Sequence, residues 1–389
     1  MMNAVPKGAT QCTPERTSAL LVVRSVEAIP VAIPFLKPVL MGGGQKIEHS
    51  ESLIVRIEAS SGIVGWGEAS AAPVMTGDTL PAMREAVEKH LAPRLVGQSA
   101  LDRIRLSRVL DEAIIGNTGA KAACDIALHD LVGKHYGVPV VQLLGGKARE
   151  RLLALAQLGN PDIEEDIAEA RKKRAEGYTY FKLKVGVKPV DQEIEAAHAL
   201  RAALGPDALL CADANMGMSV ANARKFARGA ADADLLYLEQ PFRGNDLANT
   251  LTLARVSPIA LCADESAHSV ESIMDWQRAG AIAGVNLKTI KLGGMVPTLR
   301  AATVSHTLGL AINLASKTGE SSIAVAALTH LGYTVPNLDW GININNHYIT
   351  ADLVTQPLRQ SGGSVDCPEG PGLGVEVDED AVRRFRVEA

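Results

Sequence analysis

The sequence predicts an α/β protein: a modified TIM-type (β/α) barrel with an N-terminal α+β capping domain that is completed by the C-terminal tail. Two observations predict this arrangement. From about Leu152 onward, short β-rich runs alternate with charged stretches of helical length, which indicates parallel strands joined by helices. Polar residues also recur at the ends of successive runs at intervals of about 25 residues, which is the length of one β/α unit.

The composition is that of a folded globular protein. Of the 389 residues, 47% are hydrophobic and 21% are charged, so the chain can bury a large core. The net charge of −5 is spread along the chain without a basic block, and no nucleic-acid partner is expected. The apolar stretch over residues 28–44 is interrupted by prolines and a lysine, so it predicts no membrane-spanning helix and no membrane partner.

The cysteines predict a reducing compartment. Five cysteines lie far apart in the sequence and form no Cys-x-x-Cys pair, which favours neither a disulfide framework nor a zinc site. A cytoplasmic location is therefore expected.

The chain before the barrel has the pattern of a small α+β domain. Residues 53–57 and 63–68 flank a turn that contains Gly62, and they predict an antiparallel hairpin. Thr118 is expected to cap a helix that ends near Gly137.

Eight runs are expected to form the barrel strands, and four segments to make up the chain. The runs are residues 152–158, 180–186, 208–215, 235–240, 259–265, 285–291, 311–316 and, more weakly, 339–344. The segments are a loose tail (1–18), the capping domain (19–145), the barrel (146–350) and a C-terminal segment (351–389) that packs back on the capping domain, with a last short strand after a loop at residues 368–374. Because the C-terminal ends of barrel strands meet at one rim, polar side chains there should converge on one mouth.

Two lysines share one side of the second predicted strand. In the run Phe181-Lys182-Leu183-Lys184, strand alternation should turn Phe181 and Leu183 toward the helices and both lysines toward the barrel interior. A single Lys-x-Lys is a weak signal, and a solvated strand edge that carries two charges is the alternative.

Three carboxylates, Asp213, Glu239 and Asp264, end the next three apolar runs. Carboxylates that converge at a barrel mouth repel one another, so they must take up protons or hold a cation. Oxygen ligands without histidine or thiolate favour a hard divalent ion, Mg²⁺ or Mn²⁺. The alternative is that each carboxylate caps the following helix, which would explain one of them more easily than three at a regular interval.

Two further lysines lie in the sixth run. Lys288 ends its first part, residues 285–288, and should flank the carboxylates from the side opposite Lys184, whereas Lys291, three residues later, is expected to be a loop charge. Such a set suits proton transfer at the carbon next to a substrate carboxylate, because a cation can stabilise the enolate-like charge that develops on the carboxylate oxygens.

Together these motifs resemble the enolase superfamily and, within it, the muconate lactonizing enzyme (muconate cycloisomerase) subgroup of the mandelate racemase/muconate lactonizing enzyme family. The similarity covers nearly the whole chain after the predicted tail. The segments that carry it are GIVGWGE (62–68), GVP (137–139), LLGG (143–146), FKLKVG (181–186), DAN (213–215), LEQP (238–241), ADES (263–266), residues 287–294 and PGLG (371–374).

The resemblance implies a role for each residue of the predicted site. It implies metal ligands at Asp213, Glu239 and Asp264, with Mg²⁺ or Mn²⁺ as the cofactor. It implies acid/base residues at Lys184 and Lys288, with Lys182 supporting Lys184 and the substrate carboxylate. It also implies that Asn215 and Glu265 lie behind the ligands, and that Glu320 lies near the substrate after the seventh strand.

The resemblance further implies that the capping domain acts as a lid. Its loops at residues 40–46 and 73–78 should close over the barrel mouth, exclude water and select the substrate. The implied partner is a small-molecule carboxylate, and the implied assembly is a homo-oligomer.

The resemblance leaves the reaction open. The mandelate-racemase-like branch carries a histidine at the end of the seventh strand, and residues 311–317 contain none. His306 and His330 are expected to be structural, and His268 is expected on a helix surface. The leading hypothesis is a metal-dependent isomerase of the muconate cycloisomerase type that forms an enolate (enediolate) intermediate.

Several alternatives stay open beside this hypothesis. They are a racemase or epimerase of N-substituted amino acids, an o-succinylbenzoate-synthase-like or β-elimination enzyme, and a non-catalytic binding or structural descendant. A dipeptide epimerase is disfavoured, because the stretch at residues 338–341 lacks the Asp-x-Asp that such enzymes carry. Lys317 is either an additional contact for a substrate carboxylate or a loop charge.

Overall fold

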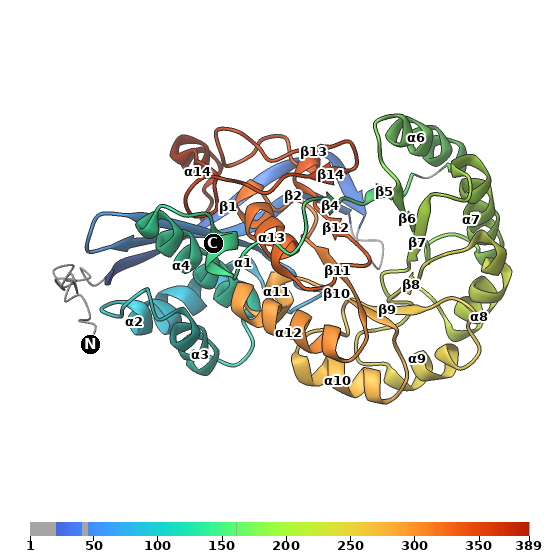
Figure 1. Cartoon of the computed structure of the whole chain (residues 1–389), viewed down its shortest axis with the longest axis horizontal. Helices are drawn as coiled ribbons and strands as arrows, with labels where there is room; N and C mark the ends of the chain where they lie inside the picture. The colour runs from blue at the N-terminus through green and yellow to red at the C-terminus, as the bar shows by residue number, and fades with distance from the viewer. Residues whose placement is uncertain (1–20, 41–45, 161, 389) are drawn as a thin grey trace, which may run out of the picture.

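The computed structural model describes residues 21–40, 46–160 and 162–388 and has the predicted α/β architecture (Figure 1). A sheet with its helices forms one side of the molecule, and a barrel surrounded by helices forms the other. The tail expected at residues 1–18, and residues 41–45 of one predicted lid loop, lie outside the described residues.

The capping domain is a three-stranded antiparallel sheet with helices packed on it. Its strands, in spatial order, are β1 (Val23–Leu40), β2 (Lys46–Ala59) and β3 (Val64–Ser70). Its helices are α1 (Leu80–Ala86), α2 (Ala92–Leu95), α3 (Arg103–Ala113), α4 (Thr118–Tyr136) and α5 (Val140–Leu143). The predicted hairpin is β2–β3, whereas β1 was not predicted, because Pro30, Pro34 and Pro38 obscure its strand pattern. These prolines are tolerated because β1 is an edge strand.

Helix α4 packs directly against β3. A Cβ atom on Gly65 would lie 2.2 Å from the carbonyl oxygen of Ala127, and one on Gly67 would lie 2.0 Å from that of Ala123. Only glycine allows this approach, which explains the two glycines inside the strand. The helix ends before Gly137 as predicted, but its N-cap is Asn117 rather than Thr118, which forms the first turn.

The barrel is a sheet of eight parallel strands in the order β12-β11-β10-β9-β8-β7-β6-β5. A parallel bridge between Ala154 and Ile342 joins its two ends. The strands are β5 (Ala156–Leu158), β6 (Tyr180–Lys184), β7 (Leu209–Asp213), β8 (Leu238–Glu239), β9 (Leu261–Ala263), β10 (Gly284–Leu287), β11 (Ala311–Ala315) and β12 (Ile342–Asn343). Each predicted run contains one of them.

Helices surround this sheet on the outside (Figure 1). They are α6 (Ile163–Ala175), α7 (Val190–Leu204), α8 (Val220–Gly229), α9 (Leu247–Ala254), α10 (Val270–Arg278), α11 (Thr289–Leu292), α12 (Met295–Thr307) and α13 (Ser322–Thr334). A separate small sheet contains β4 (Leu152–Leu153), β13 (Gln360–Ser361) and β14 (Ser364–Val365). The predicted sixth run was too long, because β10 ends at Leu287 and α11 follows almost at once.

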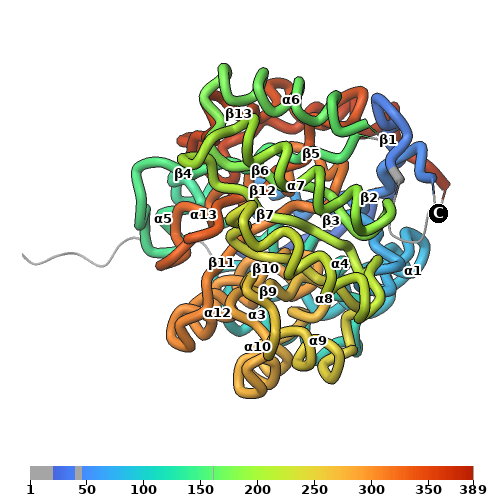
Figure 2. The backbone as a smooth tube through the Cα atoms, turned by 90° about the vertical axis from the view of Figure 1, so that its right-hand side faces the viewer, coloured from blue at the N-terminus to red at the C-terminus, as the bar shows by residue number. Residues whose placement is uncertain are grey.

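The C-terminal segment returns to the capping domain. Val31 of β1 forms an antiparallel bridge with Arg386, and the Val387 N–H donates to the carbonyl of Pro30. Both views show this end of the chain beside β1 (Figure 1, Figure 2). The last short strand expected here is wrong: α14 (Glu379–Phe385) forms instead, capped by the Asp378 side chain.

Side chains fill the barrel interior at the N-terminal end of the strands. The Tyr180 hydroxyl donates to the Tyr237 hydroxyl at 3.0 Å, and the Tyr237 and Trp340 rings lie 4.1 Å apart between centroids. Cys211 and Cys262 belong to the same buried cluster. Polar chemistry is therefore confined to the opposite, C-terminal end of the strands.

The described part of the chain contains free cysteines and no membrane-spanning helix. Its four cysteines, Cys124, Cys211, Cys262 and Cys367, are free and buried. None of its helices has the length and apolar character needed to cross a membrane.

Candidate active site

The strand register brings the predicted carboxylates together. Lys184 pairs with Asp213 across β6 and β7, and Asp213 pairs with Glu239 across β7 and β8. Neighbouring strands lie about 4.8 Å apart, so these residues form one row at the C-terminal rim. Asp264 directly follows β9, the next strand in the sheet. All three carboxylates are at most 3% exposed.

Lysines occupy the oxygens of these carboxylates. Lys182 Nζ lies 2.6 Å from Glu239 Oε2 and 3.9 Å from Asp213 Oδ2. Lys184 Nζ lies 2.6 Å from Asp213 Oδ2, and Lys288 Nζ lies 2.6 Å from Asp264 Oδ2. Lys182 is only 1% exposed, so it does not lie on a solvated strand edge.

Other residues cap the helices that follow these strands. The N-cap side chains of α8, α9 and α10 are Ser219, Asp246 and Ser269. None of the three rim carboxylates therefore serves as a helix cap, and that alternative is wrong.

Lys291 belongs to this cluster, and its interpretation as a loop charge is wrong. It is 1% exposed, and its Nζ donates to Asp264 Oδ1 at 2.7 Å and to the Asn286 carbonyl at 2.7 Å. A third bond goes to the backbone carbonyl of Asp264. The turn of α11 directly after β10 brings this side chain back into the barrel, which a longer strand would not do.

Burial and the neighbouring charges shift the pKa values of the carboxyl groups. Burial alone would raise the pKa of Asp264, but Lys288 and Lys291 outweigh it and hold that pKa well below its usual range. Burial would also raise the pKa of Asp213, but the charges of Lys184 and Lys182 outweigh it and lower that pKa. The pKa of Glu239 is raised, by burial first and then by the charge of Asp213.

The pKa of Lys288 rises for the same electrostatic reason. Burial would lower it, but the carboxylates of Asp264, Glu265 and Glu239 outweigh the burial. The resting site is thus a compact set of paired charges with little contact with solvent.

The donor set fits a hard divalent cation. As positioned, no three His, Cys, Asp or Glu side chains of the described residues are arranged to hold a metal ion, because ammonium groups occupy the carboxylate oxygens. The groups present are nevertheless oxygen donors only, from three consecutive strands, as Mg²⁺ or Mn²⁺ prefers. Glu265 lies beside them with Oε2 buried and without a hydrogen-bond partner, and burial and the Asp264 charge raise its pKa to about 8.

Amide side chains orient the charged residues. Asn215 Oδ1 accepts from Lys184 Nζ at 2.6 Å, as expected for a residue beside the site. Asn286 Nδ2 donates to Glu239 Oε1 at 2.9 Å, and Gln240 Oε1 accepts from the Asp264 N–H at 2.9 Å. Sequence reasoning missed the last two residues. Strand alternation could have identified Asn286, because it lies two residues before Lys288 on the same side of the run.

The capping domain contacts the site at the C-terminal end of the barrel strands. Met75, in the predicted lid loop at residues 73–78, places its Sδ 3.9 Å from Lys288 Nζ. Glu320 is buried under the same domain, where it accepts from the N–H groups of Ser70 at 3.4 Å and Lys317 at 2.9 Å. Burial and the neighbouring Glu68 raise the pKa of Glu320 to about 7.

Lys317 is half-buried at this end of the barrel. Burial and the positive charge of Lys288 lower its pKa, although Glu320 and Glu51 oppose that shift. Among the described residues its Nζ has no hydrogen bond or ion pair, in contrast to Lys182, Lys184 and Lys288.

None of the three histidines considered in the sequence has a hydrogen bond or ion pair with the three carboxylates among the described residues. His330 is buried in α13, whereas His306 is exposed on α12. His268 is exposed in the loop before α10, near the helix surface where it was expected.

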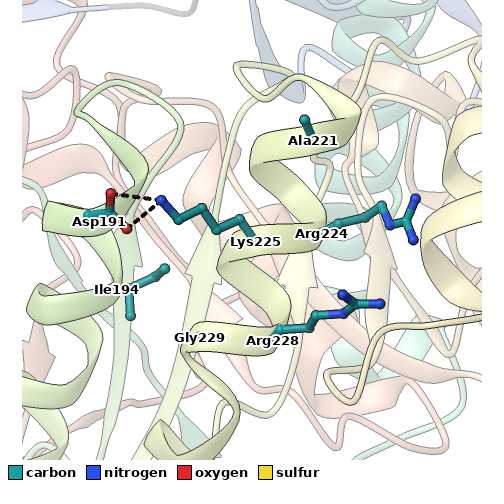
Figure 3. A pocket seen from close by; sticks show the side chains of 7 residues that line it. All are labelled: Asp191, Ile194, Ala221, Arg224, Lys225, Arg228 and Gly229. Carbon is teal, nitrogen blue, oxygen red and sulfur yellow. Dashed lines mark hydrogen bonds and ion pairs between the residues drawn. The ribbon is translucent and has the colours of Figure 1, made fainter.

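A large cleft lies elsewhere on the protein. Its volume is about 690 Å³, and it lies between α7 and α8 on the outside of the barrel. Figure 3 shows Lys225 reaching across it to Asp191, at 2.7 Å, while Arg224 and Arg228 point away on the other side of α8. It contains none of the predicted site residues, so size alone does not locate the site.

Comparisons with known proteins agree with this geometry. The family described as "Enolase C-terminal domain-like" matches residues 165–381, and the mandelate racemase/muconate lactonizing enzyme N-terminal domain matches residues 24–145. Muconate cycloisomerase 1-1 of Acinetobacter lwoffii is 32% identical over 374 residues, which cover 93% of this chain and 96% of that protein. Muconate cycloisomerase 1 of Pseudomonas putida is 31% identical over 371 residues, with coverage of 94% and 98%.

Solved structures give the same result. The muconate lactonizing enzyme from Pseudomonas fluorescens, complexed with muconolactone, superposes with a TM-score of 0.88 at 29% identity, covering 95% of this chain and all of that one. The N-succinyl Arg/Lys racemase from Bacillus cereus ATCC 14579 also has a TM-score of 0.88, at 27% identity and with coverage of 94% and 98%. The chain therefore belongs to the muconate lactonizing enzyme subgroup of the enolase superfamily and is an isomerase.

Proposed function

We propose that this isomerase depends on a divalent metal ion and acts on a small carboxylate, through an enediolate intermediate, in a muconate-cycloisomerase-like reaction. One observation carries the proposal: two lysines flank a row of three buried carboxylates. Lys184 pairs with the first carboxylate of the row, and Lys288 pairs with the last. The similarity to muconate cycloisomerases supports it.

Asp213, Glu239 and Asp264 would hold the cation, Mg²⁺ or Mn²⁺. Bound there, the cation would stabilise the negative charge that develops on the substrate carboxylate. Lys184, fixed by Asn215, would transfer the proton at the neighbouring carbon, with Lys288 on the opposite face. Lys182 would compensate the buried charge of Glu239 and keep its carboxylate in place.

The excess of positive charge favours an anionic substrate. Four lysine side chains pair with the three carboxylates of the row: Lys182, Lys288 and Lys291 are buried, and Lys184 is half-buried. The half-buried Lys317 lies near Lys288. A cation would add to this excess, so a substrate with at least one carboxylate is needed to balance it. The loop around Met75 would cover the bound substrate and exclude water.

The proposal also includes a homo-oligomer in the cytoplasm. The family resemblance supports the oligomer, and the free, buried cysteines of the described chain support a reducing compartment.

A racemase or epimerase of N-substituted amino acids is the second candidate. Lysines on both faces of the row are what two-base racemisation needs, since one removes the proton and the other returns it. The similarity to an N-succinyl Arg/Lys racemase supports it.

Exchange of the proton next to the carboxylate with solvent deuterium, measured by NMR, tests both candidates when the probes are an N-succinyl amino acid and the lactone of a muconate-like diacid. We expect exchange that stops with EDTA and returns with Mg²⁺ or Mn²⁺. Two-base chemistry predicts that Lys184→Ala and Lys288→Ala each lose exchange with a different enantiomer first. A cycloisomerase predicts that Lys184→Ala abolishes turnover of a muconate-like diacid, whereas Lys288→Ala slows it.

Lys225→Ala, in the outer cleft, is the matched control and should behave like the unmodified protein. If both active-site variants stayed fully active, the assignment of the lysines would be wrong. Exchange that EDTA leaves unchanged would remove the metal from the proposal.

A further inference from the structure

A second pocket lies where the capping domain meets the barrel, away from the row of carboxylates. We call it the seam pocket. Its volume is about 290 Å³, near the lower end of the range of roughly 300 to 1,000 Å³ for small-molecule sites. The residues that line it are Arg103, Ile104, His129, Leu143, Leu144, Val296, Leu299, Arg300 and Thr303. They come from α3, α4, α5 with the residue after it, and α12.

His129, which lines this pocket, has a hydrogen-bond acceptor that is unpaired among the described residues. Its ring is fully buried, and Nδ1 lies 2.7 Å from the backbone carbonyl of Asp125. A carbonyl oxygen only accepts, so Nδ1 carries the hydrogen and Nε2 of the neutral ring has a free lone pair. Nε2 is buried without a hydrogen-bond partner among the described residues. Burial also lowers the pKa of His129, which keeps the ring neutral.

Arg103 presents an unpaired donor in the same pocket. Its Nη2 donates to the Leu143 carbonyl at 3.3 Å, which fixes the guanidinium group, but its Nε is buried without a partner among the described residues. No acidic side chain lines the pocket, and Arg300 adds a second positive charge. The Asp125 carboxylate lies on the Nδ1 side of His129, with Oδ2 3.5 Å from Nδ1, and its charge partly balances that of Arg103. Oδ2 also accepts from the N–H of Met295 at the start of α12.

These groups define the chemistry of a ligand. The guanidinium group selects a carboxylate, because charge-assisted hydrogen bonds are the strongest that Arg103 can make. The lone pair of His129 Nε2 selects a hydroxyl donor. The remaining walls, from Ile104, Leu143 and Val296 among others, are apolar and suit a single ring.

We propose that the seam pocket binds a monocyclic aromatic carboxylic acid that carries a hydroxyl group. The site is separate from the row of carboxylates, so it stands whether or not the proposed reaction is correct. The seam pocket is connected to the candidate active site through the chain, because only Gly293 and Gly294 separate α12 from α11, which carries Lys291.

Calorimetric titration of the full-length protein with the three isomeric hydroxybenzoates tests the proposal. At least one isomer should bind more tightly than benzoate, which lacks the hydroxyl, and than phenol, which lacks the carboxylate. Arg103→Met should weaken binding roughly tenfold, the effect of losing a hydrogen bond to a charged group. Arg105→Met, on the outer face of the same helix, is the matched control and should leave binding unchanged.

A second variant guards against misfolding of Arg103→Met. Ile104 is 69% exposed, so Ile104→Trp should fill the pocket and abolish binding without lowering the melting temperature. Lys184→Met should retain binding, which separates this site from the barrel mouth. The proposal is overturned if no isomer binds up to its solubility limit, or if binding survives both pocket variants. A crystal structure with the probe in the barrel mouth would overturn it as well.

Discussion

Single residues of the active site are held in place by charges that are buried together. Lys182 and Glu239 are each 1% exposed and lie 2.6 Å apart. Removing one member of such a pair leaves an uncompensated buried charge, which costs about 3 to 5 kcal/mol. Lys317 differs from the other lysines of the site because its ammonium group has no partner among the described residues. It is therefore the cation best able to meet an incoming carboxylate.

We expect Lys317→Met to raise the KM of the carboxylate substrate roughly tenfold with little change in kcat, because it removes one charge-assisted contact that forms on binding. Steady-state kinetics measure both constants. Lys317→Arg keeps the charge and should restore most of the affinity. A fall in kcat at unchanged KM would show that Lys317 acts in the chemical step instead.

His330 should make stability depend on pH. Burial lowers the pKa of this histidine from 6.5 to about 4, and its Nε2 lies 3.1 Å from the Leu373 carbonyl. Between these two pH values the unfolded chain binds more protons than the folded chain, so stability falls as the pH decreases from 6.5 to about 4. The loss is about 3 kcal/mol, since one pKa unit corresponds to about 1.4 kcal/mol.

His330→Gln should remove this part of the pH dependence while it keeps a donor for Leu373. Urea unfolding at several pH values measures it, and His306→Gln on the exposed surface of α12 is the control. An unchanged slope of stability against pH would contradict the assignment.

At the scale of elements, the strand β10 fits the cluster of Tyr180, Tyr237 and Trp340 that fills the N-terminal end of the barrel. A Cβ atom on Gly284 would lie 2.2 Å from the Trp340 ring and 2.6 Å from the Ala311 carbonyl oxygen. The indole ring therefore fills the space that a side chain on β10 would take. The same strand contains Asn286 and ends directly before Lys288, so its packing against Trp340 affects the position of both residues in the candidate site.

Gly284→Ala should destabilise the protein by about 3 kcal/mol, because neither the ring nor the neighbouring strand can move freely. Chemical denaturation gives the free energy of unfolding. In Trp340→Leu the added methyl group should cost less, because only the clash with the Ala311 carbonyl oxygen remains, so the two changes should not be additive. Gly370→Ala, whose nearest contact would be 3.2 Å from the Gly374 Cα, is the control with a small expected effect.

At the scale of the whole molecule, buried carboxylates of the capping domain join it to the barrel. Glu68 on β3 accepts from the Ser321 N–H at 2.9 Å, from the Ser321 hydroxyl and from the Ala324 N–H at 3.2 Å. These donors belong to the N-terminal end of α13, where a negative charge is favourable. Asp125 binds the start of α12 in the same way.

Glu68→Gln should lower the free energy of unfolding by about 2 kcal/mol, since the amide group turns a donor toward N–H groups that need an acceptor. Glu58→Gln, in the half-buried pair with Arg56 at 3.1 Å, should change it by less than about 1 kcal/mol. Thermal unfolding compares the two variants. Equal losses in the two variants would mean that Glu68 contributes no more to stability than the half-buried pair of Arg56 and Glu58.

The sequence predicts the barrel and most of the site for one physical reason. Alternation along a strand and the length of a β/α unit are local properties, and together they bring the ends of strands far apart in the chain to one rim. Lys184, Asp213 and Glu239 lie at or beside strand ends, and the register pairs them as these rules require. β1 was not predicted because its prolines hide the strand pattern. The sheet tolerates these prolines because β1 lies at its edge.

The sequence by itself determined the fold class, the strands that carry the carboxylates and the side of each strand that faces inward. The tertiary structure decided where side chains beyond the strand ends lie. Lys291 turns back to Asp264 because α11 begins almost directly after β10. Lys317 has no partner within residues 21–40, 46–160 and 162–388, and Glu320 beside it is held by backbone N–H groups. Such positions depend on turns and on contacts between domains, which no local periodicity encodes.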